Sequence, residues 1–194
     1  MGVSGVGEPP VVLTDGVVAL RAFEPDDAPA VFTACQDPLI ARFVPIPQPY
    51  TAATARKFVA RRRADWDGET ERSFAITDAM TGEVMGAIAR HLRAEHRAEL
   101  GYWLAPWGRG RGMATRALRL VGDWSFEVTG LVRLELFTHP DNEASGRVAL
   151  RAGFYREGVR RGWDLDRDGL PEDDVFYALL RDDARPPAPG AAGT

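Results

Sequence analysis

The sequence predicts a single mixed α/β domain in which helices flank a largely antiparallel sheet. Strand-like and helix-like segments alternate along the chain, which is typical of this class. Hairpins, such as the turn expected at residues 78–82, open and close the series of strands, and this argues against a doubly wound parallel sheet. With 194 residues, of which 45% are hydrophobic, the chain can bury one sizeable core.

The chain is predicted to begin with a flexible tail at residues 1–10, and a single domain is predicted to span residues 11–183. In the first half of this domain, Pro29 lies near the start of a predicted helix, where its missing N–H is tolerated. Three prolines within residues 44–50 force an extended loop, and Thr51 caps the long helix that follows. The elements expected here are strands at 17–21, 73–77, 84–91 and 98–104 and helices at 26–35 and 51–66.

The second half is predicted to contain an amphipathic helix at residues 115–128, with charged side chains away from its buried face. That face is formed by Ala114, Ala117, Leu118, Val121 and Ser125. Gly153 is suited to end a second, shorter helix. The other elements expected are this short helix at 144–152, strands at 133–138, 154–163 and 174–180, and a disordered tail at 184–194.

Composition and charge exclude some classes of binding partner. The net charge is −4 and both signs are spread along the chain, so we expect no broad nucleic-acid or membrane surface. No apolar run approaches the ~20 residues that a membrane span needs. Cys35 is the single cysteine. An intramolecular disulfide is therefore impossible, and we expect a cytoplasmic protein with Cys35 as a buried apolar side chain.

A glycine-rich turn between a predicted strand and a predicted helix is the most informative motif. Residues Arg109 to Ala114 read R-G-R-G-M-A. A turn in this position aims free backbone N–H groups and the positive end of a helix at a phosphate. Arg109 and Arg111 add positive charge beside those amides. The motif predicts a cofactor that carries phosphate.

Three cofactor patterns compete for this turn. A dinucleotide fingerprint fails because position 113 is not glycine, and a P-loop fails because Gly112 is followed by Met113 and Ala114 instead of Lys and Ser or Thr. The pattern R-x-x-G-x-A is met by Arg109, Gly112 and Ala114, and it would set a pyrophosphate over the amides of residues 110–115. An ordinary loop at a helix start remains the structural alternative.

Two longer runs extend the motif. The run E-L-G-Y-W-L-A-P-W-G-R-G-R-G-M-A-T-R-A-L, followed by H-P-D-N-E-A-S-G-R-V-A-L-R-A-G-F, resembles the GNAT N-acetyltransferase superfamily. Within it, the resemblance is closest to the ribosomal-protein N-terminal acetyltransferases (RimJ/RimL-like), and it covers about residues 12–182. It implies a single domain of that family, with a central mixed sheet splayed at a bulge.

The resemblance also implies an acyl-CoA-dependent N-acyltransferase with acetyl-CoA or another acyl-CoA as co-substrate and no metal. A homodimer is an expectation from the family alone. The residues that would hold the cofactor are Trp103, Leu104, Arg109, Gly110, Arg111, Gly112, Met113, Ala114, Thr115 and Asn142. Ser145 matches the position that faces the departing thiolate. Many members use a tyrosine as acid, but Tyr155 lies beyond the matching helix and is not given that role.

Acyl transfer to an amine needs a group that removes a proton from the ammonium. Glu99 is the candidate base, because it lies on the strand that would splay open; a solvent-facing carboxylate is the alternative. Glu157 is the second choice for the base. Ser145 is the candidate catalytic hydroxyl, and a helix cap is its structural alternative.

Two further patterns indicate metal sites weakly. Asp164 to Gly169 resembles the start of a calcium loop, but the twelfth position is Val175, so we expect a hairpin turn. His91 and Glu95-His96 nearly match a zinc motif, but in a hairpin context. Trp107 is expected either in the core or at the mouth of the acceptor site.

The sequence therefore predicts an acetyltransferase that acts by direct attack in a ternary complex, because no well-placed cysteine could carry the acyl group. The acceptor is left open between a protein N-terminus and a small amine. Residues 44–50 and 51–66 are expected to shape the acceptor site. A closed acidic pocket there would favour small amines, whereas an open groove would favour peptides. A non-catalytic acyl-CoA-binding sensor or interaction module is the alternative function.

Overall fold

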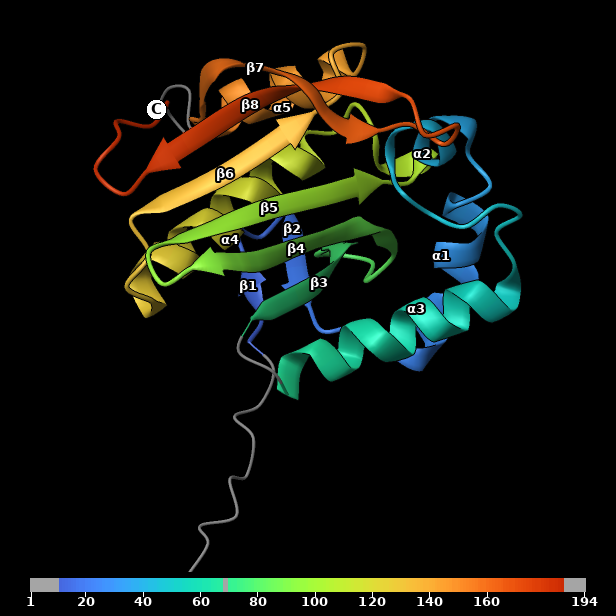
Figure 1. Cartoon of the computed structure of the whole chain (residues 1–194). Helices are drawn as coiled ribbons and strands as arrows, with labels where there is room; N and C mark the ends of the chain where they lie inside the picture. The colour runs from blue at the N-terminus through green and yellow to red at the C-terminus, as the bar shows by residue number, and fades with distance from the viewer. Residues whose placement is uncertain (1–10, 68–69, 187–194) are drawn as a thin grey trace, which may run out of the picture.

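Eight strands form one mixed sheet in the computed structural model, which describes residues 11–67 and 70–186 (Figure 1). The strand order is β1-β2-β3-β4-β5-β6-β8-β7, and every neighbouring pair is antiparallel except β5 and β6. The strands are β1 Leu13–Thr14, β2 Val18–Arg21, β3 Glu71–Asp78, β4 Val84–Ala94, β5 Arg97–Leu104, β6 Arg133–Thr138, β7 Tyr155–Leu165 and β8 Pro171–Leu180. The predicted mixed, mostly antiparallel sheet is confirmed.

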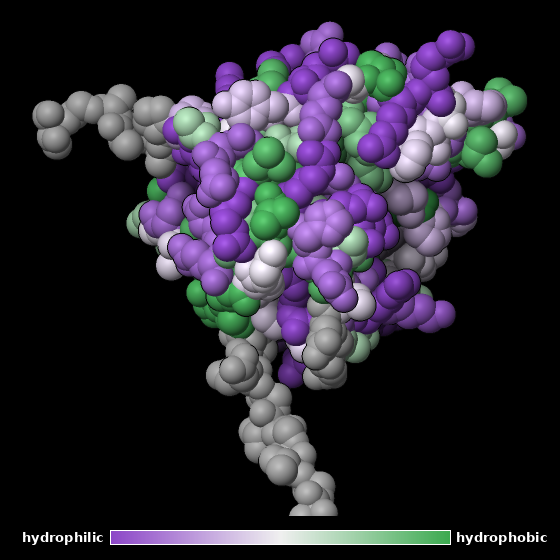
Figure 2. Space-filling view, turned by 60° about the vertical axis from the view of Figure 1, so that its left-hand side comes forward, coloured by the Kyte–Doolittle hydropathy of each residue, from purple (hydrophilic) through white to green (hydrophobic). Residues whose placement is uncertain are grey.

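Helices cover both faces of this sheet. They are α1 Ala28–Ala34, α2 Pro38–Phe43, α3 Ala52–Ala64, α4 Met113–Val128 and α5 Glu143–Ala152, with 3-10 turns at Pro25–Asp27, Asp65–Asp67 and Pro106–Gly108. One core lies between the sheet and helices α4 and α5, and a second lies between the other face and helices α1 to α3. The side of the molecule that Figure 2 brings forward is mostly hydrophilic, with small separate hydrophobic patches.

Helix α4 confirms the amphipathic pattern read from the sequence. All five side chains assigned to its inner face are at most 3% exposed. Helix α5 is capped by Asn142, whose Oδ1 accepts a hydrogen bond from the backbone N–H of Ser145, and it ends at Gly153 with φ of +100°. Helix α3 begins after Thr51, which caps it as predicted.

The main differences from the predicted elements lie near the N-terminus. Helix α2 and the two-residue strand β1 were not predicted. Asp37 caps α2 by accepting hydrogen bonds from the N–H groups of Leu39 and Ile40. The predicted helix at 26–35 begins instead with a 3-10 turn. The tail expected at 1–10 and residues 187–194 of the expected C-terminal tail lie outside the described residues, whereas Arg185 forms an ion pair with Asp123.

A gap opens in the middle of the sheet, between the two parallel strands. Strands β5 and β6 pair only at Arg97 with Arg133, Ala98 with Leu134 and Glu99 with Glu135. Beyond these pairs the strands diverge (Figure 1). The irregular register between β4 and β5 lies at Leu92 to Ala94, at the hairpin end and not beside the gap. Half of the backbone groups in the rest of β5 therefore face an open edge.

Within residues 11–67 and 70–186, no helix has the length and apolar character needed to cross a bilayer.

Candidate active site

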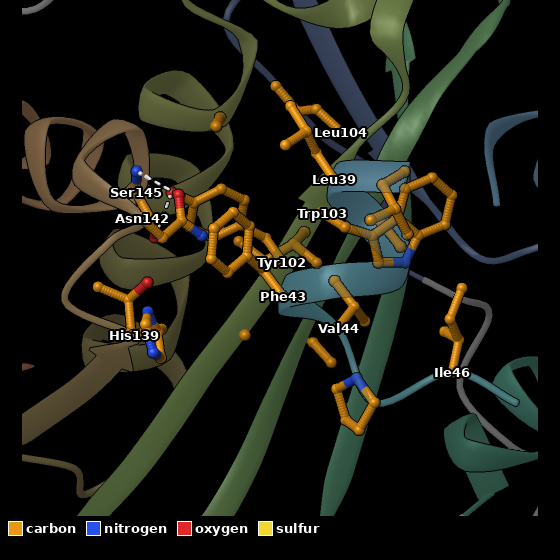
Figure 3. A pocket seen from close by; sticks show the side chains of 18 of the residues that line it. Leu39, Phe43, Val44, Ile46, Tyr102, Trp103, Leu104, His139, Asn142 and Ser145 are labelled. Atoms are coloured by element: carbon orange, nitrogen blue, oxygen red, sulfur yellow. Dashed lines mark hydrogen bonds between the residues drawn. The ribbon is translucent and has the colours of Figure 1, made fainter. Parts of the chain in front are cut away.

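A cleft of about 1300 Å³ lies where β5 and β6 diverge. Figure 3 shows His139, Asn142 and Ser145 on one side of it, Phe43, Val44 and Ile46 on the other, and Tyr102 between them. The predicted site residues that line it are Glu99, Trp103, Leu104, Arg109, Gly110, Ala114, Asn142 and Ser145. The structure thus brings both candidate catalytic residues and most of the predicted cofactor contacts to one cavity.

The glycine-rich turn forms the end of this cleft next to helix α4. Gly110 and Gly112 have φ of +73° and +74°, a conformation that favours glycine, and no heavy atom lies within 4 Å of a Cβ built on either. The first helical hydrogen bond runs from Arg116 N–H to the Gly112 carbonyl at 3.1 Å. The N–H groups of Met113 to Thr115 therefore have no acceptor in their own helix. This open backbone fits a phosphate group.

Two predicted residues of the turn can contribute only through their backbone. The side chains of Met113 and Thr115 are buried, with 1% and 4% exposure, and neither lines the cleft. Arg111 and Gly112 also lie outside the lining. A ligand at the turn would meet the amides and not the side chains of Met113 and Thr115.

Both arginines of the turn are held by carboxylates. Arg109 donates to both oxygens of Asp37, at 2.7 and 3.2 Å, and to the Leu104 carbonyl at 3.2 Å. The hydrogen bond from Arg109 holds the pKa of Asp37 below its usual range. Arg111 donates to Asp78 at 2.6 Å. Arg109 therefore fixes the turn to the cap of helix α2, a contact 72 residues apart in sequence that no local pattern indicates.

A hydroxyl pair lies beside the gap between the strands. The Tyr102 and Ser145 hydroxyl oxygens are 3.0 Å apart and hydrogen-bonded. Burial raises the pKa of Tyr102 to about 12, so the phenol is protonated at neutral pH. Asn142, and not Ser145, provides the side-chain cap of α5, and the Ser145 residue lines the cleft. Alternation along a strand puts Tyr102 on the same face as Leu100, but no local pattern in the sequence indicates its contact with Ser145.

Glu99 lines the cleft where β5 and β6 part, and its side chain is 18% exposed. Its carboxylate accepts a hydrogen bond from Arg93 at 2.7 Å. His91 on β4 pairs with Glu99 in the register of the two strands. Burial lowers the pKa of His91, so its imidazole is neutral at pH 7. Glu157, the second choice for a base, lies outside the cleft lining and is paired with Arg133.

The weaker motifs have structural explanations. Asp166 accepts hydrogen bonds from the N–H groups of Asp168 and Leu170, so the calcium-like run is a hairpin turn, as predicted. No group of three or more His, Cys, Asp or Glu in the described part of the chain is arranged to hold a metal ion. Trp107 donates to the Val84 carbonyl at 2.9 Å and lies outside the cleft lining. Cys35 is buried, which raises its thiol pKa to about 11.

The two segments predicted to shape the acceptor site line the cleft in part, and a helix that was not predicted lines it as well. Residues 44–47 and Tyr50 of the proline-rich loop line the cleft, together with Phe58 and neighbouring side chains of α3. Leu39 and Phe43 of the unpredicted helix α2 also line it.

Known proteins share this fold and sequence pattern. The acetyltransferase (GNAT) domain family matches residues 18–155. The uncharacterised N-acetyltransferase YoaA of Bacillus subtilis is 28% identical over 174 residues, covering 89% of this chain and 97% of YoaA. The probable N-acetyltransferase YjcK of the same species is 32% identical over 137 residues, covering 69% and 75%.

Among solved structures, Mycobacterium smegmatis RimJ in complex with CoA-disulfide has a TM-score of 0.76 and 25% identity, covering 91% of this chain and 89% of that one. The match of the family to most of the chain decides its membership. This chain belongs to the GNAT acetyltransferase family and is an N-acetyltransferase.

Proposed function

We propose that the protein transfers an acetyl group from acetyl-CoA to a primary amine by direct attack while both are bound. The observation that carries this proposal is one continuous cleft, which joins the glycine turn, the open edge of β5 and the Tyr102–Ser145 pair. The order of these features along the cleft matches acetyl-CoA, in which the phosphates lie towards one end and the thioester lies at the other.

The chain has a suitable group for each part of the cofactor. The amides at Gly110 to Thr115 would hold the pyrophosphate, with Arg109 fixing the turn and Arg111 adding charge at its rim. The open backbone edge at Trp103 and Leu104 would hold the arm. The Asn142 side chain uses its oxygen as a helix cap, which leaves its NH₂ group as a donor to the same arm. When bound, acetyl-CoA supplies the acetyl group as a thioester.

Two residues would manage the protons of the reaction. A C–N bond forms, a C–S bond breaks, and the ammonium of the acceptor must first lose a proton. Glu99 would take this proton through water, with Arg93 holding the carboxylate in place. Ser145, hydrogen-bonded to the protonated Tyr102 phenol, would pass a proton to the departing sulfur, and the second proton that the attacking nitrogen loses would replace it. Cys35 is buried and protonated, so no acyl-cysteine step is included.

The test is amine-dependent release of thiol from acetyl-CoA, with mass spectrometry of the acetylated product. Ser145→Ala and Glu99→Gln should each lower kcat by about 10²-fold, the range for general acid–base groups. Affinity for CoA, measured by calorimetry, should change less than about twofold. Glu143→Gln is the matched control, because Glu143 is an exposed carboxylate at the rim of the cleft. Unchanged kcat in both test variants, or thiol release that ignores the amine, would contradict the proposal.

A further inference from the structure

A group of carboxylates lines the cleft at the β7–β8 end. Asp164 and Glu172 are partners across these strands, and Asp174 lies two residues further along β8. All three line the same cavity as Ser145 and Glu99. His139, at the end of β6, brings its Nε2 to 3.4 Å from Glu172. This end of the cleft is therefore acidic, although the glycine turn at the other end is suited to an anion.

Asp174 is the unusual member of this group. The residue is 7% exposed, and its buried Oδ2 has no hydrogen-bond partner among the described residues. Its cross-strand neighbour is Arg160, whose guanidinium lies 3.6 Å from the centre of the Phe176 ring and forms no hydrogen bond to this oxygen. A buried carboxylate oxygen without a donor is costly.

The charges around Asp174 indicate which kind of ligand group its carboxylate would bind. Burial raises its pKa, and the negative charges of Asp164, Glu172 and Asp173 raise it further, while His139 lowers it. His139 itself pairs with Glu172 and Asp141 and not with Asp174, so the Asp174 carboxylate has no positively charged hydrogen-bond donor among the described residues. A ligand ammonium in the cleft would supply both the charge and the hydrogen bond.

Two links across the cleft enclose this acidic end. Arg167, at the tip of the β7–β8 hairpin, donates to the Ala41 carbonyl at 2.5 Å and to the Ile46 carbonyl at 3.3 Å. Arg42 of α2 pairs with Asp141 at 2.5 Å. Figure 1 shows the β7–β8 turn reaching α2. These contacts tie the two walls together, which suits a small acceptor better than a polypeptide.

We propose that the acceptor is a small amine with at least two ammonium groups, one of which is bound by Asp174 while the other is acetylated. This inference rests on the proposed acetyl transfer and adds the class of substrate. Flexible aliphatic diamines and rigid amino sugars share the required chemistry.

The test compares probes that differ in one charge. Calorimetry would measure the affinity of 1,4-diaminobutane, 1-aminobutane and kanamycin for the full-length wild-type protein and for Asp174→Asn. Wild type should bind the diamine or kanamycin at least tenfold more tightly than the monoamine, and the tighter of the two identifies the source. Asp174→Asn should weaken that binding by about 10- to 100-fold, as for loss of a charged hydrogen bond, and change monoamine binding less than about twofold.

Controls separate loss of the site from loss of the fold. Asp182→Asn removes the same charge from an exposed position outside the cleft and should change neither affinity. Asp174→Asn should also raise the Tm without ligand, because it removes a buried, unpartnered charge. If that variant does not fold, Glu172→Gln at the half-exposed neighbour replaces it, with an expected loss of about threefold or more in affinity for the multiply charged probe.

The outcomes distinguish this inference from the proposed function. Equal affinity of wild type for the monoamine and for both multiply charged probes, or unchanged affinity in the substituted proteins, overturns the second-charge site. Acetylation of the monoamine would still support acetyl transfer in that case. Conversely, tight binding of the diamine or of kanamycin that depends on Asp174 supports the second-charge site even if no acetyl product forms. The absence of acetyl product would then count against the proposed function alone.

Discussion

Gly86 lets strand β4 approach strand β5, and its replacement by alanine tests that packing. Gly86 pairs with Leu104 in the register of the two strands. A Cβ at this position would lie 2.2 Å from the Trp103 carbonyl oxygen and 3.1 Å from the Leu104 Cα. Both contacts are with backbone, so no side chain can rotate away to relieve them.

The cost follows from the missing space. Non-bonded carbon contacts are comfortable at about 3.5–4.0 Å, so the strands must separate by more than about 1 Å at this point. Overpacking of this kind lowers the free energy of unfolding by about 2–3 kcal/mol, which corresponds to a fall in Tm of about 4–12 °C for a chain of this size. Since Trp103 and Leu104 carry proposed cofactor contacts, the KM for acetyl-CoA should rise as well.

Gly101→Ala is the matched control on the neighbouring strand. No heavy atom lies within 4 Å of its added Cβ, and alanine is favoured over glycine within a strand by roughly 0.5–1 kcal/mol. Urea unfolding of wild type and both variants measures the difference. A Gly86→Ala protein within about 0.5 kcal/mol of wild type, which is the usual effect of a harmless surface change, would refute the reasoning.

Three further substitutions test other contacts of the cleft. Gly112→Ala should lower the free energy of unfolding by about 1–2 kcal/mol, the cost of a left-handed residue, as measured by urea unfolding. Arg109→Ala should lower the free energy of unfolding by about 1 kcal/mol at pH 7, because it removes the ion pair with Asp37. The folded-state pKa of Asp37 is lowered, so the stabilisation from this pair is present above the unfolded pKa of about 3.9 and is lost as the pH falls through the folded-state pKa. The Tm values of variant and wild type should therefore converge in acid. Arg167→Ala should raise the KM for the amine severalfold with little effect on the KM for acetyl-CoA, and equal changes in both would contradict its role at the acceptor end.

Local patterns in the sequence were sufficient for most of the fold. The inner face of α4 follows from apolar spacing, and Thr51 and Gly153 mark helix ends through their own backbone and side-chain chemistry. The glycine turn was recognisable because its conformation, with positive φ at Gly110 and Gly112, restricts the residues allowed there. Such features depend on neighbours within a few positions.

Features that depend on distant residues could not be predicted in this way. The partner of Arg109 is Asp37, so the sequence suggested a free arginine where the fold has an ion pair. The contact between Tyr102 and Ser145 requires the relative placement of β5 and α5. The isolation of Asp174 follows from the position taken by the Arg160 side chain, which no spacing rule specifies.

Strands β5 and β6 pair over only a short length, and this boundary, called the seam below, divides the sheet into two halves. Three residue pairs join the half-sheet of β1 to β5 to the half-sheet of β6 to β8. Behind the sheet, α4 packs mainly on the first half-sheet, α5 packs on the second, and the two helices contact each other. Helix α4 also reaches the second half-sheet, since a Cβ at Gly122 would lie 3.5 Å from the Leu134 side chain and 3.9 Å from that of Leu179. Side-chain packing of these two helices therefore adds to the few backbone hydrogen bonds that hold the half-sheets together. Amide hydrogen exchange at the open edge of β5 would report how strongly this packing protects the seam.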